Sequence, residues 1–173
     1  ILLFMALYFQ FVLHELPCPL CLLQRVGFLG IAIALLLNFR FGQRPSHYAL
    51  ALLFSLFVAF VALRQIVLHI VPGSGSYGSA IFGLHMYTWS FIIAMLIAIG
   101  ATVTLGLDKQ YYRQNILHPA LRPAVHLLFA VTLIVTVIML VSVFAECGLA
   151  QCPDNPVHYL LSSAASYVSA HLA

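Results

Sequence analysis

The stretch PLCLLQRVGFLGIAIALLLNF, residues 19–39, is an apolar run whose only charged side chain is Arg25. A helix of about 20 such residues is long enough to cross the roughly 30 Å of hydrocarbon in a bilayer. Similar runs occupy residues 1–16, 47–71, 84–107 and 123–145, and the first of them is short. They are continuous rather than alternating, which favours helices, because a helix satisfies its own backbone groups in lipid. We therefore expect an all-α polytopic transmembrane helix bundle, with a four-helix core and a fifth transmembrane helix.

The composition agrees with lipid as the solvent of this chain. Its 173 residues are 64% hydrophobic and only 6% charged, whereas a soluble domain carries about 25% charged residues. The net charge of +3 is too small and too scattered to indicate nucleic-acid binding, and four acidic residues weaken any mechanism that needs a carboxylate pair. We expect one integral membrane domain over residues 1–173, in contact with lipid and not with nucleic acid.

The basic residues predict how the bundle is oriented. Five of the seven follow the second and fourth apolar runs, which parity puts on one face: Arg40, Arg44, Lys109, Arg113 and Arg122. By the positive-inside rule this face is cytoplasmic. All four cysteines, Cys18, Cys21, Cys147 and Cys152, then fall on the opposite face. The outer side of a bacterial inner membrane is where disulfides persist, so we expect the cysteine pairs on the periplasmic face.

The two ends of the chain carry weaker signals. Residues 1–13 are not expected to be a signal peptide, because the boundary at 14–18 lacks the small-residue cleavage pattern. Near the other end, Asp154 or Asn155 can cap a helix with Pro156 in its first turn. Apolar residues recur on one face of residues 156–171, but the segment is too polar to span a membrane. We expect a helix there that lies flat on the outer surface.

A CxxC motif, Cys18-Pro19-Leu20-Cys21, opens the second apolar run. The spacing puts the two sulfurs close enough to bridge, and the N-terminus of a helix stabilises a thiolate. This favours a redox pair, with a structural disulfide and a metal site as alternatives. Arg25 lies one helical turn deeper on the same face as Cys21. A cation in an apolar helix needs a partner or a pocket, so Arg25 can stabilise a thiolate at Cys21 or donate to a carbonyl oxygen of a bound ligand. The alternative is that the long Arg25 side chain extends to the outer membrane interface.

A second polar group, Arg64, Gln65 and His69, lies near the outer end of the third run. Gln65 and His69 are four residues apart and share a helix face, whereas Arg64 and Gln65 do not. We expect these side chains to meet Arg25 across the bundle. Anchoring at the membrane interface explains His69 almost as well.

Cys147 and Cys152 form the second pair, separated by four residues that include Gly148. A disulfide can close this small loop, either as a staple that holds the tail or as a mobile exchange site for soluble partners. Zinc needs consideration, because both cysteine spacings occur in zinc sites. An oxidising face and a neighbouring arginine disfavour a cation, so we expect no metal site.

Residues 18–25, CPLCLLQR, resemble the CxxC motif and following arginine of the DsbB family, inner-membrane oxidases that regenerate a periplasmic thiol oxidase. Residues 77–80 and 83–89, YGSA and GLHMYTW, also resemble a subgroup of that family. The resemblance implies a thiol:quinone oxidoreductase that passes electrons from a thioredoxin-like, DsbA-like oxidase to ubiquinone or menaquinone. It implies that Cys21 faces the quinone and that Cys18 exchanges with the second pair. Arg25 matches the family arginine at the quinone, with His69, Arg64 and Gln65 as further candidates for binding it.

The chain departs from the family pattern in the place of its second pair. Better-known members carry that pair in the loop between helices three and four, whereas residues 72–83 here contain no cysteine. The pair instead follows the fifth apolar run, and parity returns it to the outer face. A related quinone or epoxide reductase with another thiol donor, a zinc-binding membrane module and a scaffold with two structural disulfides remain alternatives.

Overall fold

The computed structural model describes residues 2–70, 80–107, 111, 122–148, 152 and 159. Its helices are α1 (Leu2–Phe11), α2 (Pro19–Phe41), α3 (Pro45–Leu68), α4 (Met86–Leu105) and α5 (Arg122–Cys147). In the described part of the chain, α2, α3, α4 and α5 are long and apolar enough to cross a membrane, and α1 is shorter. The expected all-α membrane bundle is confirmed. The surface helix expected at residues 156–171 lies outside the described residues.

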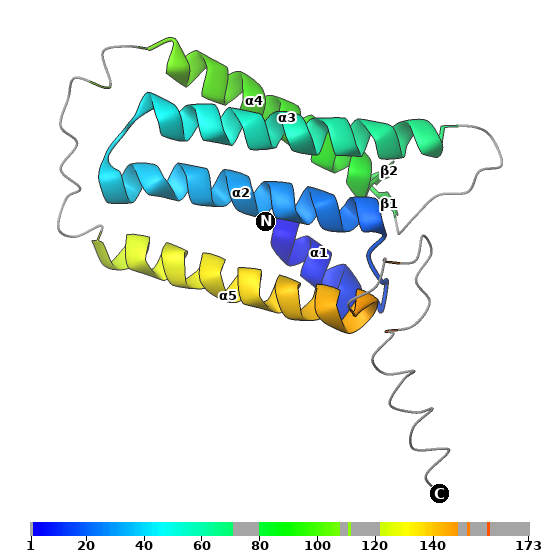
Figure 1. Cartoon of the computed structure of the whole chain (residues 1–173). Helices are drawn as coiled ribbons and strands as arrows, with labels where there is room; N and C mark the ends of the chain where they lie inside the picture. The colour runs from blue at the N-terminus through cyan, green and yellow to red at the C-terminus, as the bar shows by residue number, and fades with distance from the viewer. Residues whose placement is uncertain are drawn as a thin grey trace, which may run out of the picture.

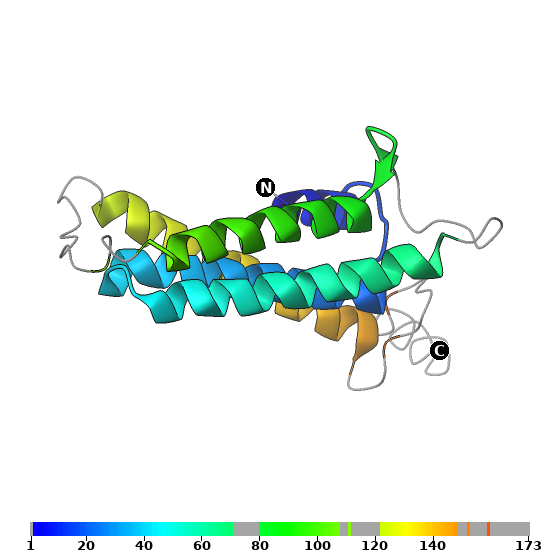
Figure 2. The ribbon, with the colours of Figure 1, turned by 90° about the horizontal axis from the view of Figure 1, so that it is seen from above.

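The long helices lie side by side, with α2 in the middle (Figure 1). α2 packs against α3 on one side and α5 on the other, and α3 packs against α4. The start of α2, the end of α3, the start of α4 and the end of α5 lie at one end of the bundle, and Figure 2 shows the same grouping from above. We call this the cysteine end, because Cys18, Cys21 and Cys147 lie there.

The bundle buries polar side chains and exposes apolar ones. Phe60 and Leu53 on α3 are 70% and 65% exposed. The buried polar and charged residues include Gln10, Gln24, Arg25, Ser55, Gln65, Ser90, Ser142 and Glu146. This arrangement fits a lipid-facing surface, since polar groups in a membrane protein face the bundle interior.

Two apolar clusters hold α2 in its central position. Ile31 packs with Val58 and Ala59 of α3 and with Ala94 of α4. Leu29 packs on another side with Val135 and Met139 of α5 and with residues of α1. Leu29 and Ile31 are two residues apart in α2 and pack against different helices, so α2 lies at the centre of the bundle.

The helix boundaries differ from those expected by a few residues at all five helices. The first run is helical only to Phe11, because His14 adopts a positive φ of 56° and Pro17 limits its neighbour to extended backbone. The fourth helix starts at Met86 rather than at 84, because Leu84–His85 (β2) pairs antiparallel with Ala80–Ile81 (β1). The other boundaries are Pro45–Leu68 in place of 47–71, and Arg122–Cys147 in place of 123–145. The second helix begins at Pro19 as expected and ends at Phe41, two residues beyond 39.

Candidate active site

Cys18 and Cys21 form a disulfide at the start of α2, with their Cα atoms 5.0 Å apart. Cys18 is the N-cap residue of the helix and has extended backbone, and Pro19 occupies the first helical turn. The backbone N–H of Cys21 donates to Cys18 Sγ at 3.1 Å. Such a donor belongs to the unpaired N–H groups of a helix N-terminus, which stabilise negative charge. The local sequence thus builds a site where a thiolate at Cys18 is favoured.

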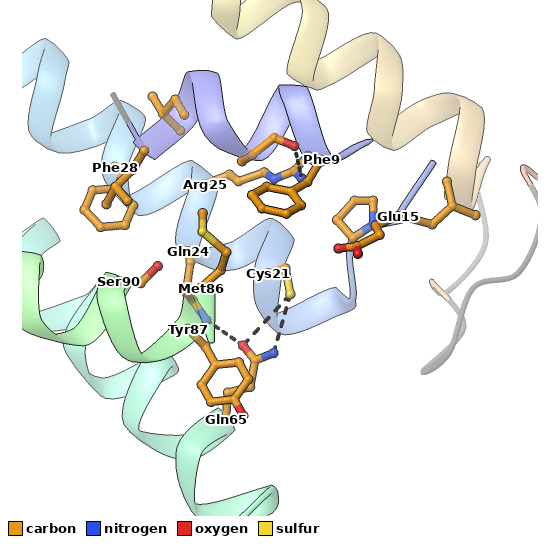
Figure 3. A pocket seen from close by; sticks show the side chains of 15 residues that line it. Phe9, Glu15, Cys21, Gln24, Arg25, Phe28, Gln65, Met86, Tyr87 and Ser90 are labelled. Atoms are coloured by element: carbon orange, nitrogen blue, oxygen red, sulfur yellow. Dashed lines mark hydrogen bonds between the residues drawn. The ribbon is translucent and has the colours of Figure 1, made fainter. Parts of the chain in front are cut away.

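Gln65 reaches the same disulfide from the end of α3. Its Nε2 lies 3.3 Å from Cys18 Sγ and 3.5 Å from Cys21 Sγ. Its Oε1 accepts a hydrogen bond of 2.7 Å from Gln24 Nε2 on α2. The Gln65 side chain is fully buried, and Figure 3 shows its amide between Gln24 and Cys21. The Gln65 amide therefore contacts both sulfurs, and the Gln24 amide from the neighbouring helix holds the Gln65 oxygen.

Cys21 also faces a pocket of about 670 Å³ of empty space, part of it open to the surroundings. The pocket lies among α1, α2, α3 and α4, and its walls include Phe9, Phe28, Met86 and Tyr87 (Figure 3). Its polar lining residues are Glu15, Gln24, Arg25, Gln65 and Ser90. Cys18 does not line it and is 6% exposed. Only the second cysteine of the motif thus faces this space.

A larger groove of about 1250 Å³ adjoins the pocket. The two share four lining residues, which are Leu2, Leu3, Phe28 and Met86. All the other residues that line the groove are apolar, among them Ile31, Trp89 and Ile93. The pocket and the groove together suit a ligand with a polar head and a long apolar tail.

Arg25 lies deeper in the bundle and joins three helices. Its Nη1 donates to Gln10 Oε1 of α1 at 2.5 Å, and its Nη2 donates to the Ala6 carbonyl at 3.1 Å. Nη1 also lies 3.7 Å from Met139 Sδ of α5. Arg25 is only 9% exposed, so its guanidinium lies among these partners inside the bundle and not at the interface.

The fifth helix presents a polar face to this arginine. Met139, Ser142 and Glu146 lie three and four residues apart, so they share one face of α5, and each is at most 5% exposed. Ser142 Oγ accepts a hydrogen bond of 3.1 Å from Gln10 Nε2. Glu146 is attracted electrostatically by Arg25, and its Oε2 has no hydrogen-bond partner among the described residues. The polar face of α5 therefore packs against α1 and against α2, which carries the CxxC motif.

Cys147 follows Glu146 directly and forms a disulfide with Cys152, with their Cα atoms 4.7 Å apart. Gly148 adopts a positive φ of 60° where the chain turns out of the helix, a conformation that favours glycine. Figures 1 and 2 both place this end of α5 at the cysteine end of the bundle. The two disulfides thus lie at the same end, as parity of the helices predicts.

The other candidate residues lie farther from the pocket. The ring of His69 stacks on Tyr87 at 5.5 Å between centroids, and its Nδ1 lies 2.8 Å from the Gln65 carbonyl oxygen. Tyr87 lines the pocket and His69 lies behind it. Arg64 is on the exposed face of α3 and does not line the pocket. The structure thus brings Gln65 to the sulfurs but leaves Arg64 outside.

The sequence analysis did not single out Gln10, Gln24, Ser90 or Glu146. Gln10, Gln24 and Ser90 lie within apolar runs and Glu146 directly follows one, and polar residues in membrane helices generally face the interior and mark functional positions. Applying that rule to every polar residue in the runs would have selected them. In the described part of the chain, no group of three or more His, Cys, Asp or Glu residues gathers in a way that could hold a metal ion.

Comparison with known proteins finds a family match in the N-terminal part of the chain. Residues 1–77 match the family model described as "Disulfide bond formation protein DsbB". A disulfide bond formation protein B of Nitrosomonas eutropha is 45% identical over 65 residues, which cover 35% of this chain and 40% of the relative. One from Stutzerimonas stutzeri is 37% identical over 76 residues, 42% of this chain and 47% of the relative. The chain thus spans less than half the length of these curated relatives. No solved structure matches it significantly.

Proposed function

We propose that this chain, whose residues 1–77 match the DsbB family model, is a thiol:quinone oxidoreductase of the bacterial inner membrane. It takes electrons from a periplasmic thioredoxin-like oxidase of the DsbA type and delivers them to ubiquinone or menaquinone. The observation that carries the proposal is Cys21, a disulfide sulfur that faces a pocket joined to a long apolar groove.

The lining of the pocket fits the chemistry of a quinone. Phe9, Phe28 and Tyr87 offer flat apolar surfaces for a ring. Arg25, Gln24 and Ser90 carry donors that suit carbonyl oxygens. The adjoining groove suits an isoprenoid tail, which is why we favour a lipid-soluble quinone over a water-soluble acceptor. A bound quinone would supply the two-electron acceptor, while the protein supplies position and electrostatics.

The cysteine pairs perform the exchange steps. A thiolate of the partner attacks the Cys147–Cys152 disulfide, and the resulting dithiol reduces Cys18–Cys21 by the same chemistry. Cys18, which does not line the pocket, is the sulfur we assign to exchange with the second pair, and Cys21 is the one that faces the acceptor. The positive-inside rule puts both pairs on the periplasmic face, where the partner is found.

A turnover assay tests this function directly. The purified chain in detergent, given a reduced thioredoxin-like donor and a soluble ubiquinone analogue, should reduce the quinone, which is followed by its loss of ultraviolet absorbance. Cys21→Ser should lower the rate to the level of the uncatalysed reaction. Ser55→Ala is the matched control, because Ser55 is buried in α3 and its hydroxyl donates to the Ala51 carbonyl of its own helix. Turnover that persists in Cys21→Ser would refute the proposal.

A further inference from the structure

We propose that Gln65 is a catalytic residue that stabilises the thiolates released when the Cys18–Cys21 disulfide opens, and that Gln24 positions its amide. The inference rests on the proposed function, because it concerns the thiol–disulfide exchange of the same pair. It changes the role assigned to Gln65, which the sequence analysis placed among the quinone-binding candidates. The structure puts the Gln65 amide against the sulfurs.

One amide nitrogen is within hydrogen-bond reach of both sulfurs. Gln65 Nε2 lies 3.3 Å from Cys18 Sγ and 3.5 Å from Cys21 Sγ, within the range of N–H donors to sulfur. The side chain is fully buried, so water cannot take the place of this donor. A donor to a charged acceptor is worth about twice a donor to a neutral one. The contact therefore strengthens when either sulfur becomes a thiolate, which favours the reduced form of the pair.

Gln24 determines which end of the Gln65 amide faces the sulfurs. Its Nε2 donates to Gln65 Oε1 at 2.7 Å, which occupies the carbonyl oxygen and leaves the NH₂ group toward Cys18 and Cys21. If the Gln65 amide were reversed, its NH₂ would face the NH₂ of Gln24 and its oxygen would face the thiolates. Gln24 is itself 5% exposed and lies on α2, which also carries both cysteines. Hydrogen bonds thus run from Gln24 on α2 to the Gln65 amide on α3, and from that amide to the two sulfurs.

The same amide can serve two successive leaving groups. In the first step, a donor thiol loses its proton, and the resulting thiolate forms a bond to Cys18 Sγ. The Cys18–Cys21 bond breaks, and its electron pair stays on Cys21 Sγ. In the second step, the other donor thiolate attacks its own partner in the mixed disulfide and releases Cys18 Sγ as a thiolate. The donor dithiol is oxidised by two electrons and Cys18–Cys21 is reduced by two. Each departing sulfur lies within reach of Gln65 Nε2.

Arg25 is placed for a different task. Its described hydrogen bonds run to Ala6 and Gln10 of α1 and to Met139 of α5. The described donors to the sulfurs are the Cys21 backbone N–H and the Gln65 side chain. Two roles were predicted for Arg25, stabilising a thiolate at Cys21 or donating to a carbonyl oxygen of a bound ligand. The side-chain contact to the sulfurs described here comes from the neutral Gln65 amide. A neutral donor in a buried site avoids leaving an uncompensated charge when the disulfide is closed.

The test measures the thiols themselves and needs neither quinone nor partner. In a background with Cys147→Ala and Cys152→Ala, the reduced Cys18–Cys21 pair is alkylated with iodoacetamide over a range of pH, and its redox equilibrium is measured against glutathione. Gln65→Leu should lower the acid dissociation constant of the reactive thiol roughly tenfold, because a charge-assisted hydrogen bond is lost. The disulfide should become harder to reduce, with a potential more negative by about 30 mV for a tenfold change in the equilibrium constant.

Three further variants separate this role from a structural one. Gln65→Glu should lower the dissociation constant by at least as much as Gln65→Leu, because a carboxylate repels a thiolate. Gln24→Leu should shift both readouts in the same direction by a smaller factor, because the Gln65 amide is then free to turn. Ser55→Ala, on the same helix as Gln65 and about 15 Å away along its axis, should leave both unchanged.

An unchanged titration and potential in a folded Gln65→Leu protein would overturn the proposal. If Gln65→Leu does not fold, the Gln24→Leu variant decides. A wild-type thiol titration and a wild-type redox potential in that variant would also overturn the proposal. The outcome is independent of the turnover assay. Loss of quinone reduction in the unmodified chain refutes the proposed function, whereas the thiol measurements still report whether Gln65 acts on the sulfurs.

Discussion

Arg25 shows how a buried cation is accommodated in the interior of a membrane bundle. Its guanidinium is nearly buried, where an isolated cation would be strongly disfavoured. Gln10 and the Ala6 carbonyl accept its hydrogen bonds, and Glu146 supplies the opposite charge from α5. Removing one member of such a buried pair leaves the other uncompensated, which is more costly than removing both.

This predicts a coupling between Arg25 and Glu146. Arg25→Met should lower the free energy of unfolding by about 3 kcal/mol, because Glu146 is then buried without its counter-charge. Adding Glu146→Gln should recover part of that loss, because the remaining side chain is neutral. Thermal unfolding of the purified protein in detergent, run on both single variants and the double variant, gives the coupling energy. Strictly additive losses would contradict the pairing.

At the scale of elements, the close approach of α2 and α3 depends on small residues. A Cβ atom at Gly30 would lie 2.5 Å from Phe54 Cδ1, with two more atoms of the same ring at 2.6 Å. Small residues let membrane helices approach closely, and the gain is van der Waals packing, since lipid gives no hydrophobic drive between helices. The contact also aligns α3 so that Gln65 reaches the sulfurs of α2.

Gly30→Ala should therefore destabilise the bundle by about 1–3 kcal/mol, because the ring of Phe54 has to move. Gly100 on α4 offers a matched control, since a Cβ there would meet nothing within 4 Å. Gly100→Ala should leave stability unchanged or raise it slightly, because alanine is the better helix former. The midpoint of thermal unfolding is measured for both variants and compared with that of the unmodified protein. Equal shifts in the two variants would contradict the close packing at Gly30.

At the scale of the whole molecule, the two disulfides lie at one end of the bundle although long apolar helices separate them in the chain. The helix that leads to the second disulfide, α5, lies beyond the residues that match the family model. Its inward face joins the Arg25 network through Met139, Ser142 and Glu146. This packing fixes α5, whose last residue is Cys147, against the helix that carries Cys18 and Cys21.

A donor-dependence experiment tests that path. The double variant Cys147→Ser, Cys152→Ser should lose quinone reduction with a thioredoxin-like protein donor, because the donor needs the second pair to pass electrons inward. With dithiothreitol the same variant should keep most of its turnover, because a small dithiol reaches Cys18–Cys21 directly. Undiminished turnover with the protein donor would show instead that the second disulfide is a structural staple.

Local properties of the sequence were enough to predict much of this protein. Hydropathy is a local property, so the helices of a membrane bundle and most of their boundaries follow from the length of each apolar run. The exceptions, at Phe11 and Met86, arise where a positive φ at His14 and a two-residue β-pairing end or delay a helix. The CxxC motif at a helix start and the arginine one turn later are likewise local. Both features therefore predict the place of the proposed redox site from the sequence alone.

Only the tertiary structure decided which side of each helix faces inward. Arg64 and Gln65 are adjacent, and on a helix adjacent residues point in different directions, so packing against α2 alone selects Gln65 for the sulfurs. The same packing brings Glu146 to Arg25, two charges that are far apart in the chain. Sequence determines the elements because hydropathy acts residue by residue, whereas the site depends on how separate helices are rotated and docked, which no single stretch specifies.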